Sequence, residues 1–307
     1  MRALVTGING FAGGHLANFL IKKNFKVFGV DRIETKIRGI IFFKIDITNK
    51  GEVSNLIKDS NPDLIFHLAA VSSVKACKEN PQSTKNVNII GTENLLSACI
   101  KNNINPKILI PSSAHVYGIP EYTPIDEMHP VNPINEYAKS KFEQENVSLK
   151  FFKEHNLNVI ISRSFNHIGP NQPTGFVCSD FAKQIAEIEK ELIKPEIHVG
   201  DLSPIRDFSD VRDIIRAYLL LLEKGKSGEK YNVGSGIGYT IKEILTKLIE
   251  KSISKINIIE DKSLFRKSEI PTLIANNKKF VDITNWKPEF SIDQSLKDIL
   301  DYWRKQV

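Results

Sequence analysis

The sequence of 307 residues predicts an α/β fold built on a doubly wound parallel sheet, with a smaller mixed α/β domain toward the C-terminus. Three observations predict this fold. In the first half, short β-branched segments alternate with longer amphipathic segments, which is typical of parallel strands connected by helices. A glycine-rich turn stands between the first strand and the first helix. The regular alternation ends at 169–173 (GPNQP), after which Gly, Pro and Arg become frequent in loops.

The strand segments are short and apolar, as strands buried on both faces of a sheet require. We expect strands at 3–6, 26–30, 42–45, 64–68, 108–111 and 159–162. The segments between them carry apolar residues at helical spacing. We expect helices at 11–22, 51–59, 82–101 and 135–155. Helices that follow the strands in this way would cover both faces of the sheet, which gives the doubly wound arrangement.

The domain boundary is expected where the alternation ends. We assign residues 1–168 to the first domain and residues 169–307 to the second domain. The second part need not be continuous, because a strongly amphipathic helix at 210–222 is followed by a short strand at 231–233. We expect the segment 208–235 to return to the first sheet.

Composition and charge argue against several classes of protein. The hydrophobic content of 41% and the charged content of 25% are those of a globular chain. The lysines behind the net charge of +6 are scattered and are not grouped with aromatic residues, which argues against nucleic-acid binding. No apolar run reaches the ~20 residues of a membrane span. A strand that begins at residue 3 leaves no room for a signal peptide, so we expect a cytosolic protein.

Cysteine and histidine usage argues against a disulfide framework and against a metal site. The three cysteines, Cys77, Cys99 and Cys178, are an odd number without metal-ligand spacing, and we expect reduced thiols in the core. The seven histidines are dispersed without paired spacing. The sequence therefore predicts no metal centre.

The segment 6–13 (TGINGFAG) lies where the first strand turns into the first helix, and its glycines have GxxGxxG spacing. Glycines allow a tight turn and a close approach to a pyrophosphate, and free N–H groups at a helix start favour negative charge. Asp31 ends the second strand, 24 residues after Gly7, where an acidic side chain would meet ribose hydroxyls. These features predict a dinucleotide site in a Rossmann domain. Asp31 favours NAD, whereas Arg32 could accept the 2′-phosphate of NADP, so the preference stays open.

Three side chains are candidates for acid–base chemistry. Tyr137 and Lys141 are four residues apart in an expected helix, so both project from one face. Ser113 follows the strand at 108–111, and parallel sheets bind ligands at the carboxyl ends of their strands. A nearby ammonium would lower the pKa of the phenol, so Tyr137 would donate or accept a proton. Ser113 would hydrogen-bond the reacting oxygen, and Lys141 would also hold the nicotinamide ribose.

Together these features resemble the extended short-chain dehydrogenase/reductase family. The resemblance is carried by the glycine turn, His67-Leu68-Ala69-Ala70, Asn88, Ser113 four residues before Tyr117, and Tyr137 with Lys141. The segments 163–170 (RSFNHIGP) and 206–213 (RDFSDVRD) are similar to the nucleotide-sugar branch of this family, so the resemblance spans the chain. Within this branch, the segments 175–185, 199–202 and 266–271 most resemble GDP-4-keto-6-deoxy-D-mannose reductases, which form GDP-D-rhamnose.

The resemblance implies an NAD(P)-dependent enzyme that acts on the C4 carbonyl of a nucleotide sugar. It implies cofactor contacts from Gly7, Asn9, Gly10, Phe11, Ala12, Asp31, Arg32, Asp46, Ile47, Leu68, Ala69, Ala70, Asn88, Tyr137 and Lys141. It implies substrate contacts from Ser113, His115, Asn166, Lys183, Arg206 and Arg266. The two arginines would bind phosphate oxygens or sugar hydroxyls bidentately. His67 and His167 are expected to be structural. Relatives commonly pair two long helices across a twofold axis, which implies a homodimer through 82–101 and 135–155.

Three reactions of this branch use the same Tyr and Lys. A 4,6-dehydratase also needs a carboxylate base, and that branch carries Glu two residues before the position of Tyr117. This sequence has His115 there, which disfavours dehydration and favours reduction with Tyr137 as the proton donor. A 4-epimerase stays open, because it needs no further group. A non-catalytic nucleotide sensor is disfavoured by the intact Ser113, Tyr137 and Lys141. The sequence leaves the C4 configuration of the product open.

Overall fold

The computed structural model describes residues 1–265 and 270–307, and its centre is a seven-stranded parallel sheet. The strand order is β10-β6-β5-β4-β1-β2-β3. The strands are β1 (Arg2–Thr6), β2 (Lys26–Asp31), β3 (Ile41–Lys44), β4 (Leu64–His67), β5 (Lys107–Ser113), β6 (Val159–Ser164) and β10 (Lys230–Val233). The order changes direction between β1 and β4, so a crevice forms at the carboxyl ends of these strands.

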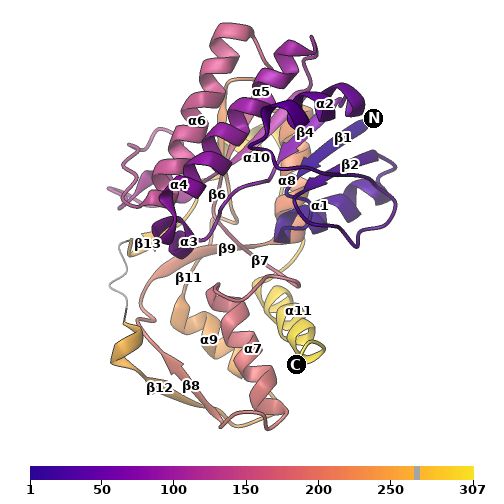
Figure 1. The fold of residues 1–307 in the computed structure, drawn as a ribbon. Helices are drawn as coiled ribbons and strands as arrows, with labels where there is room; N and C mark the ends of the chain where they lie inside the picture. Colours follow the sequence, from indigo (N-terminus) through magenta and orange to yellow (C-terminus); the bar gives the residue numbers. More distant parts are fainter. Residues whose placement is uncertain (266–269) are drawn as a thin grey trace.

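Helices cover both faces of this sheet (Figure 1). They are α1 (Phe11–Lys22), α2 (Lys50–Ser60), α5 (Gly91–Lys101), α6 (Glu136–His155), α8 (Val211–Lys224) and α10 (Lys278–Thr284). Along β1, Ala3 and Val5 share an apolar cluster with α1 and α8, whereas Leu4 shares another with α2 and α5. This alternation follows from the two-residue period of a strand. The predicted doubly wound α/β class is confirmed.

The predicted helix at 82–101 has a more complex structure. It consists of α4 (Pro81–Lys85), a π-helical segment η1 (Asn86–Ile90) and α5 in direct succession. A π turn takes more residues than an α turn, and the spacing of apolar residues does not reveal it. A further helix, α3 (Val74–Glu79), is capped by the side chain of Ser73 and is not among the helices predicted from the sequence.

The second part of the chain forms a smaller α/β unit beside the large sheet (Figure 1). One of its sheets contains β7 (Asn166–Ile168), β9 (Ile205–Asp210), β11 (Gly238–Thr240) and β13 (Thr272–Leu273). A second pairs β8 (Glu196–Val199) with β12 (Asn257–Glu260). The helices α7 (Val177–Glu189), α9 (Ile241–Ile249) and α11 (Ile292–Arg304) share one apolar core. Short 3₁₀ turns lie at η2 (Ala114–Tyr117) and η3 (Lys262–Leu264).

The chain crosses between the two parts more than once. β9 pairs with β7 in the smaller unit, and the chain then returns as α8 to pack beneath the large sheet. β10 follows and pairs with β6 at the sheet edge. The return therefore begins at Val211, and α10 later packs against α8 and β10. No helix in residues 1–265 and 270–307 is long and apolar enough to cross a membrane.

Candidate active site

A cavity of about 540 Å³ opens where the carboxyl ends of β1, β4, β5 and β6 face the smaller unit. The large sheet supplies the glycine turn and the strand ends, and the smaller unit supplies the segment that leads into α7. The lining residues are Gly7, Gly10, Phe11, Ala12, Gly13, His67, Leu68, Ala70, Ser72, Ser73, Val74, Lys75, Pro111, Ser112, Ser113, Ala114, His115, Tyr137, Lys141, Ser164, Phe165, Asn166, His167, Ile168, Gln172, Pro173, Gly175, Phe176, Val177, Cys178, Phe208 and Tyr218. A ligand in this cavity would contact both parts of the chain.

The glycine turn forms one wall of the cavity. Gly7 has a φ of +67°, and a Cβ there would lie 2.8 Å from the backbone of Ala69. A Cβ on Gly13 would overlap the carbonyl oxygen of Gly7. No side chain caps the start of α1, and its first residues line the cavity, so the positive end of the helix lies at this wall. This backbone cradle fits the pyrophosphate of a dinucleotide.

We expect Gly13→Ala to weaken NADPH binding by about tenfold or more, because overpacking against fixed backbone costs about 1–3 kcal/mol. Gly14→Ala is the matched control, since a Cβ at Gly14 would meet only the Ile8 carbonyl oxygen at 3.9 Å. Titration of the cofactor fluorescence measures both dissociation constants. Equal affinities in the two variants would contradict the assignment of this turn to the cofactor.

Asp31 and Arg32 lie at the end of β2, next to the turn. The Asp31 carboxylate accepts the N–H of Asn9 at 3.1 Å and the N–H of Arg32 at 2.8 Å. The Asn9 side chain donates to the carbonyl oxygen of Ile33 and so holds the loop after β2. The largely exposed Arg32 guanidinium lies 3.9 Å from the Asp46 carboxylate. An acidic and a basic side chain thus flank the same position, which suits either NAD or NADP.

The other residues predicted to contact the cofactor divide into two groups. Four line the cavity, namely Phe11, Ala12, Leu68 and Ala70, whereas Asp46, Ile47, Ala69 and Asn88 are not among its lining residues. The Asn88 amide oxygen accepts the N–H of Val71, and its amide nitrogen donates to Ser140 Oγ. Asn88 therefore ties the loop after β4 to α6, which positions one side of the cavity.

Ser113, Tyr137 and Lys141 come together in the cavity. Ser113 ends β5, and α6 carries Tyr137 and Lys141 one turn apart. Asn135 caps α6 by accepting the N–H of Ala138 at 2.9 Å, which starts the helix just before Tyr137. Ser113 and Lys141 are buried and Tyr137 is half-buried. The three side chains that the sequence singles out thus share one cavity wall.

Burial shifts the pKa values of Tyr137 and Lys141. It raises the pKa of Tyr137 above its ordinary value, although a hydrogen bond with Ser113 acts in the opposite direction. It lowers the pKa of Lys141 to about 8, against the attraction of the Glu145 carboxylate. The sequence predicts a lowered pKa for the phenol, and this prediction is wrong, because burial penalises the phenolate and outweighs the opposing hydrogen bond with Ser113. Tyr137 is therefore a neutral phenol, which is the form that donates a proton.

His115 lies beside Tyr137, with the two ring centroids 5.7 Å apart in an edge-to-face arrangement. The backbone N–H of His115 donates to Ser113 Oγ at 3.2 Å. Its Nδ1 is buried and has no hydrogen-bond partner within the described part of the chain. Burial, with a smaller contribution from the Arg206 charge, lowers the pKa of His115 to about 4. The ring is therefore neutral near pH 7 and can hydrogen-bond a ligand.

The remaining residues predicted to bind substrate lie in different places. Asn166 on β7 lines the cavity. Arg206 on β9 is half-buried and donates to nearby backbone carbonyl oxygens, and its charge reaches His115. Lys183 on α7 is 38% exposed, pairs with Glu187 at 3.3 Å and is not a lining residue. Arg266 lies outside the described residues.

Some lining residues are missing from the sequence predictions. Tyr218 of α8 lines the cavity, and no local signal reveals it because only the return of α8 to the large sheet brings it there. His167, expected to be structural, stacks on Phe11 with ring centroids 5.8 Å apart and also lines the cavity. Phe176, at the start of the segment that resembles the reductases, lines it as well.

Known proteins resemble the chain over its whole length. The family model described as GDP-mannose 4,6 dehydratase matches residues 4–299. The chain is 34% identical to the GDP-6-deoxy-D-mannose reductase of Pseudomonas aeruginosa, over all of this chain and 98% of that protein. The structure of RMD from Pseudomonas aeruginosa complexed with NADPH has a TM-score of 0.90 and 32% identity over the whole of both chains. The UDP-glucose 4-epimerase of Thermotoga maritima, with UDP-glucose, has a TM-score of 0.92 and 29% identity, over all of this chain and 99% of that one.

Proposed function

The chain belongs to the GDP-mannose 4,6 dehydratase family, and we propose that it reduces the C4 keto group of a nucleotide-linked 4-keto-6-deoxy sugar with NADH or NADPH. The similarity to a GDP-6-deoxy-D-mannose reductase supports GDP-4-keto-6-deoxy-D-mannose as the substrate and GDP-D-rhamnose as the product. One observation favours reduction over dehydration: no described residue that lines the cavity is Asp or Glu. Dehydration needs a base for the C5 proton, whereas reduction needs only a proton donor at the C4 oxygen.

The side chains of the cavity would act on the carbonyl oxygen of the sugar. A bound reduced nicotinamide would supply the hydride to C4. Ser113 would donate a hydrogen bond to the carbonyl oxygen, and Tyr137 would transfer its phenolic proton to the same oxygen as negative charge develops there. Lys141 is charged below its pKa of about 8 and would stabilise the phenolate that Tyr137 becomes.

Turnover of a substrate panel tests this proposal. The protein is incubated with NADH or NADPH and a GDP-, UDP- or dTDP-linked 4-keto-6-deoxy sugar, and the loss of nicotinamide absorbance is followed. We expect stoichiometric consumption with the GDP-linked sugar. NMR of the product then distinguishes the rhamno from the talo configuration at C4. Cofactor binding without turnover of any sugar would contradict the proposal and favour a nucleotide sensor.

A nucleotide-sugar 4-epimerase is the second candidate. Ser113, Tyr137 and Lys141 would suffice for it, and the superposition with a UDP-glucose 4-epimerase supports it. The same assay separates the two reactions, because an epimerase interconverts two sugars without net consumption of the cofactor.

For the nucleotide sugar, we assign Asn166 and Lys183 to the sugar and diphosphate, and Arg206 and Arg266 to phosphate oxygens or sugar hydroxyls. Asn166 lines the cavity beside the carboxyl end of β6. Burial lowers the pKa of Arg206 to about 10, so this half-buried guanidinium is still a cation at neutral pH. Charge-assisted hydrogen bonds to phosphate oxygens would stabilise it.

We expect His115→Ala to raise the KM for the keto sugar by about three- to tenfold, because the variant loses one hydrogen bond from a buried ring nitrogen to the substrate. The Kd for NADPH should be unchanged. His155→Ala, at the exposed end of α6, is the control and should alter neither constant. A weaker Kd for NADPH with an unchanged KM for the sugar would place His115 at the cofactor instead.

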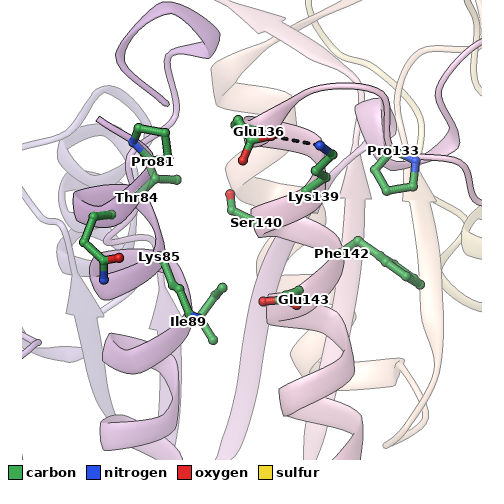
Figure 2. Close-up of a pocket in the computed structure, with 11 residues that line it drawn as sticks. Pro81, Thr84, Lys85, Ile89, Pro133, Glu136, Lys139, Ser140, Phe142 and Glu143 are labelled. Carbon is green, nitrogen blue, oxygen red and sulfur yellow. Dashed lines mark hydrogen bonds and ion pairs between the residues drawn. The ribbon is translucent and has the colours of Figure 1, made fainter. Parts of the chain in front are cut away.

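We also propose a homodimer formed through α6 and the helix that contains η1. A groove of about 420 Å³ lies between them and is lined by Thr84 and Ile89 on one side and by Ser140, Phe142 and Glu143 of α6 on the other. Figure 2 shows residues of both walls. Ile90 on η1 is 36% exposed. The same face of a second copy would cover the groove and the exposed side chain of Ile90 in a twofold arrangement. Light scattering should give twice the chain mass of 34.7 kDa, and a monomer would refute the proposal.

The cysteines support a cytosolic location for this reaction. Cys77, Cys99 and Cys178 are buried and unbridged, and burial raises the pKa of each thiol. Unbridged thiols suit a reducing compartment. Cell fractionation tests the location, and recovery of the protein outside the cytosolic fraction would contradict it.

A further inference from the structure

Gln144 is a buried side chain for which the proposed reaction has no role. It lies three residues after Lys141 on α6, and its relative exposure is 0%. Its Oε1 accepts a hydrogen bond from the Lys141 ammonium at 2.7 Å. Because an ammonium can only donate, the amide oxygen must face Lys141 and the amide nitrogen must face away from it.

The amide nitrogen of Gln144 leads to a second buried group. It donates to Thr92 Oγ1 on α5 at 2.8 Å, and the Thr92 hydroxyl donates in turn to the carbonyl oxygen of Asn88 at 2.7 Å. Since the hydroxyl proton is used in this way, Thr92 accepts from His67 Nε2, which lies 3.0 Å away. His67 therefore carries its proton on Nε2.

The hydrogen bonds continue from His67 to the loop beside the glycine turn. The unprotonated Nδ1 of His67 accepts from Thr6 Oγ1 at 2.9 Å, and Thr6 accepts the N–H of Ala69 at 3.1 Å. Burial lowers the pKa of His67 to about 3, so its ring is neutral and the direction of every bond is preserved at physiological pH. A network in which each donor has an acceptor is rigid, and this one joins α6 to α5, β4 and β1.

We propose that Gln144 is a positioning residue that holds the Lys141 ammonium at the cavity wall beside Tyr137. The inference rests on the proposed function, because the role of Lys141 in that reaction is what Gln144 would support. A lysine stem has several rotatable bonds, and a fixed acceptor selects one position for its ammonium. A neutral amide does this without neutralising the charge, whereas a carboxylate would bind the ammonium to itself.

The other charged and titratable groups near Lys141 do not replace Gln144 as the hydrogen-bond acceptor for its ammonium, so Gln144 is the residue to substitute. The groups that interact electrostatically with the Lys141 ammonium are Glu145 on α6, Cys77 on α3 and His67 on β4. The carboxylate is already paired with Arg163, the imidazole is neutral, and burial raises the pKa of the thiol. Tyr137 titrates above Lys141, so a loss of function near pH 8 would report on the ammonium.

The test compares Gln144→Met, Gln144→Glu and the wild-type chain. Two quantities are followed against pH: the Kd for NADPH, from its fluorescence, and kcat for reduction. In the wild type, binding and turnover should weaken as pH rises through about 8, where Lys141 loses its proton. Gln144→Met removes the acceptor and should move both inflections down by about one pH unit. Gln144→Glu adds a negative charge and should move them up by about the same amount.

Ser148→Ala is the matched control, because Ser148 is buried on the same helix. Its hydroxyl donates to the backbone oxygen of Gln144 at 2.7 Å and not to the Gln144 side chain. The Ser148→Ala variant should leave both inflections in place. Shifts of the two Gln144 variants in the same direction, or no shift beyond the control, would overturn the inference. If Gln144→Met does not fold, Gln144→Glu decides by itself, since an unmoved inflection in NADPH binding refutes the proposal. Binding needs no turnover, so a chain that binds NADPH but reduces no sugar would refute the proposed function alone.

Discussion

Tyr137→Phe is expected to lower kcat for keto-sugar reduction by about 10³-fold, while the Kd for NADPH stays within about twofold. The phenyl ring fills the same half-buried position on α6, but it has no proton to transfer to the developing oxygen anion. The raised pKa of Tyr137 makes this proton available throughout the neutral range. Cofactor contacts from the glycine turn do not depend on the hydroxyl. Steady-state consumption of NADPH and a fluorescence titration measure the two constants.

The control for this substitution is Tyr122→Phe. Tyr122 is 44% exposed, and its hydroxyl donates to the Asp126 carboxylate at 3.0 Å, away from the cavity lining. The Tyr122→Phe variant should have the same kcat as the wild type. Full activity of Tyr137→Phe would remove Tyr137 from the reaction, and a parallel loss of cofactor binding would make its role structural.

Glu145→Ala is expected to destabilise the protein by about 3–5 kcal/mol, the cost of leaving a buried charge without its partner. The Glu145 carboxylate accepts from Arg163 Nε at 3.0 Å and from its terminal nitrogen at 2.8 Å. The guanidinium also lies over the ring of Tyr117, 4.8 Å from its centroid. This pair joins α6, which carries Tyr137, to β6. Urea unfolding followed by circular dichroism measures the change.

Asp282→Ala serves as the comparison, because its partner Lys278 is one turn away on the exposed face of α10. We expect a change of less than about 0.5 kcal/mol in the free energy of unfolding. A similarly small change in Glu145→Ala would show that solvent reaches the Glu145–Arg163 pair.

The first half of the fold and the outline of the site could be predicted because their signals are local. The alternation of Ala3, Leu4 and Val5 between two faces is a property of any buried strand, and the glycine turn after β1 needs only its own backbone. Ser113 at the end of β5 and Tyr137 with Lys141 on α6 were predictable for the same reason, since each occupies a defined place on a regular element.

The smaller unit could not be predicted in this way. Its strands are short, and β13 has only two residues, so the local sequence gives little signal for them. They form because β9 brings together β7, β11 and β13, which come from distant parts of the chain. The π-helical turn η1 has no periodic signal of its own. Residues such as Tyr218 reach the cavity only because α8 returns to the large sheet after β9.

The sequence by itself determined the doubly wound sheet, the glycine turn after β1 and the three side chains Ser113, Tyr137 and Lys141 that line one cavity. Tertiary structure alone decided their electrostatics, because burial depends on what packs above a residue and not on its neighbours in the chain. Burial raises the pKa of Tyr137, whereas the sequence predicts that a nearby ammonium lowers it. Tertiary structure also placed Gln144 behind Lys141 and joined both, through Thr92 and His67, to strands that the sequence separates from them by dozens of residues.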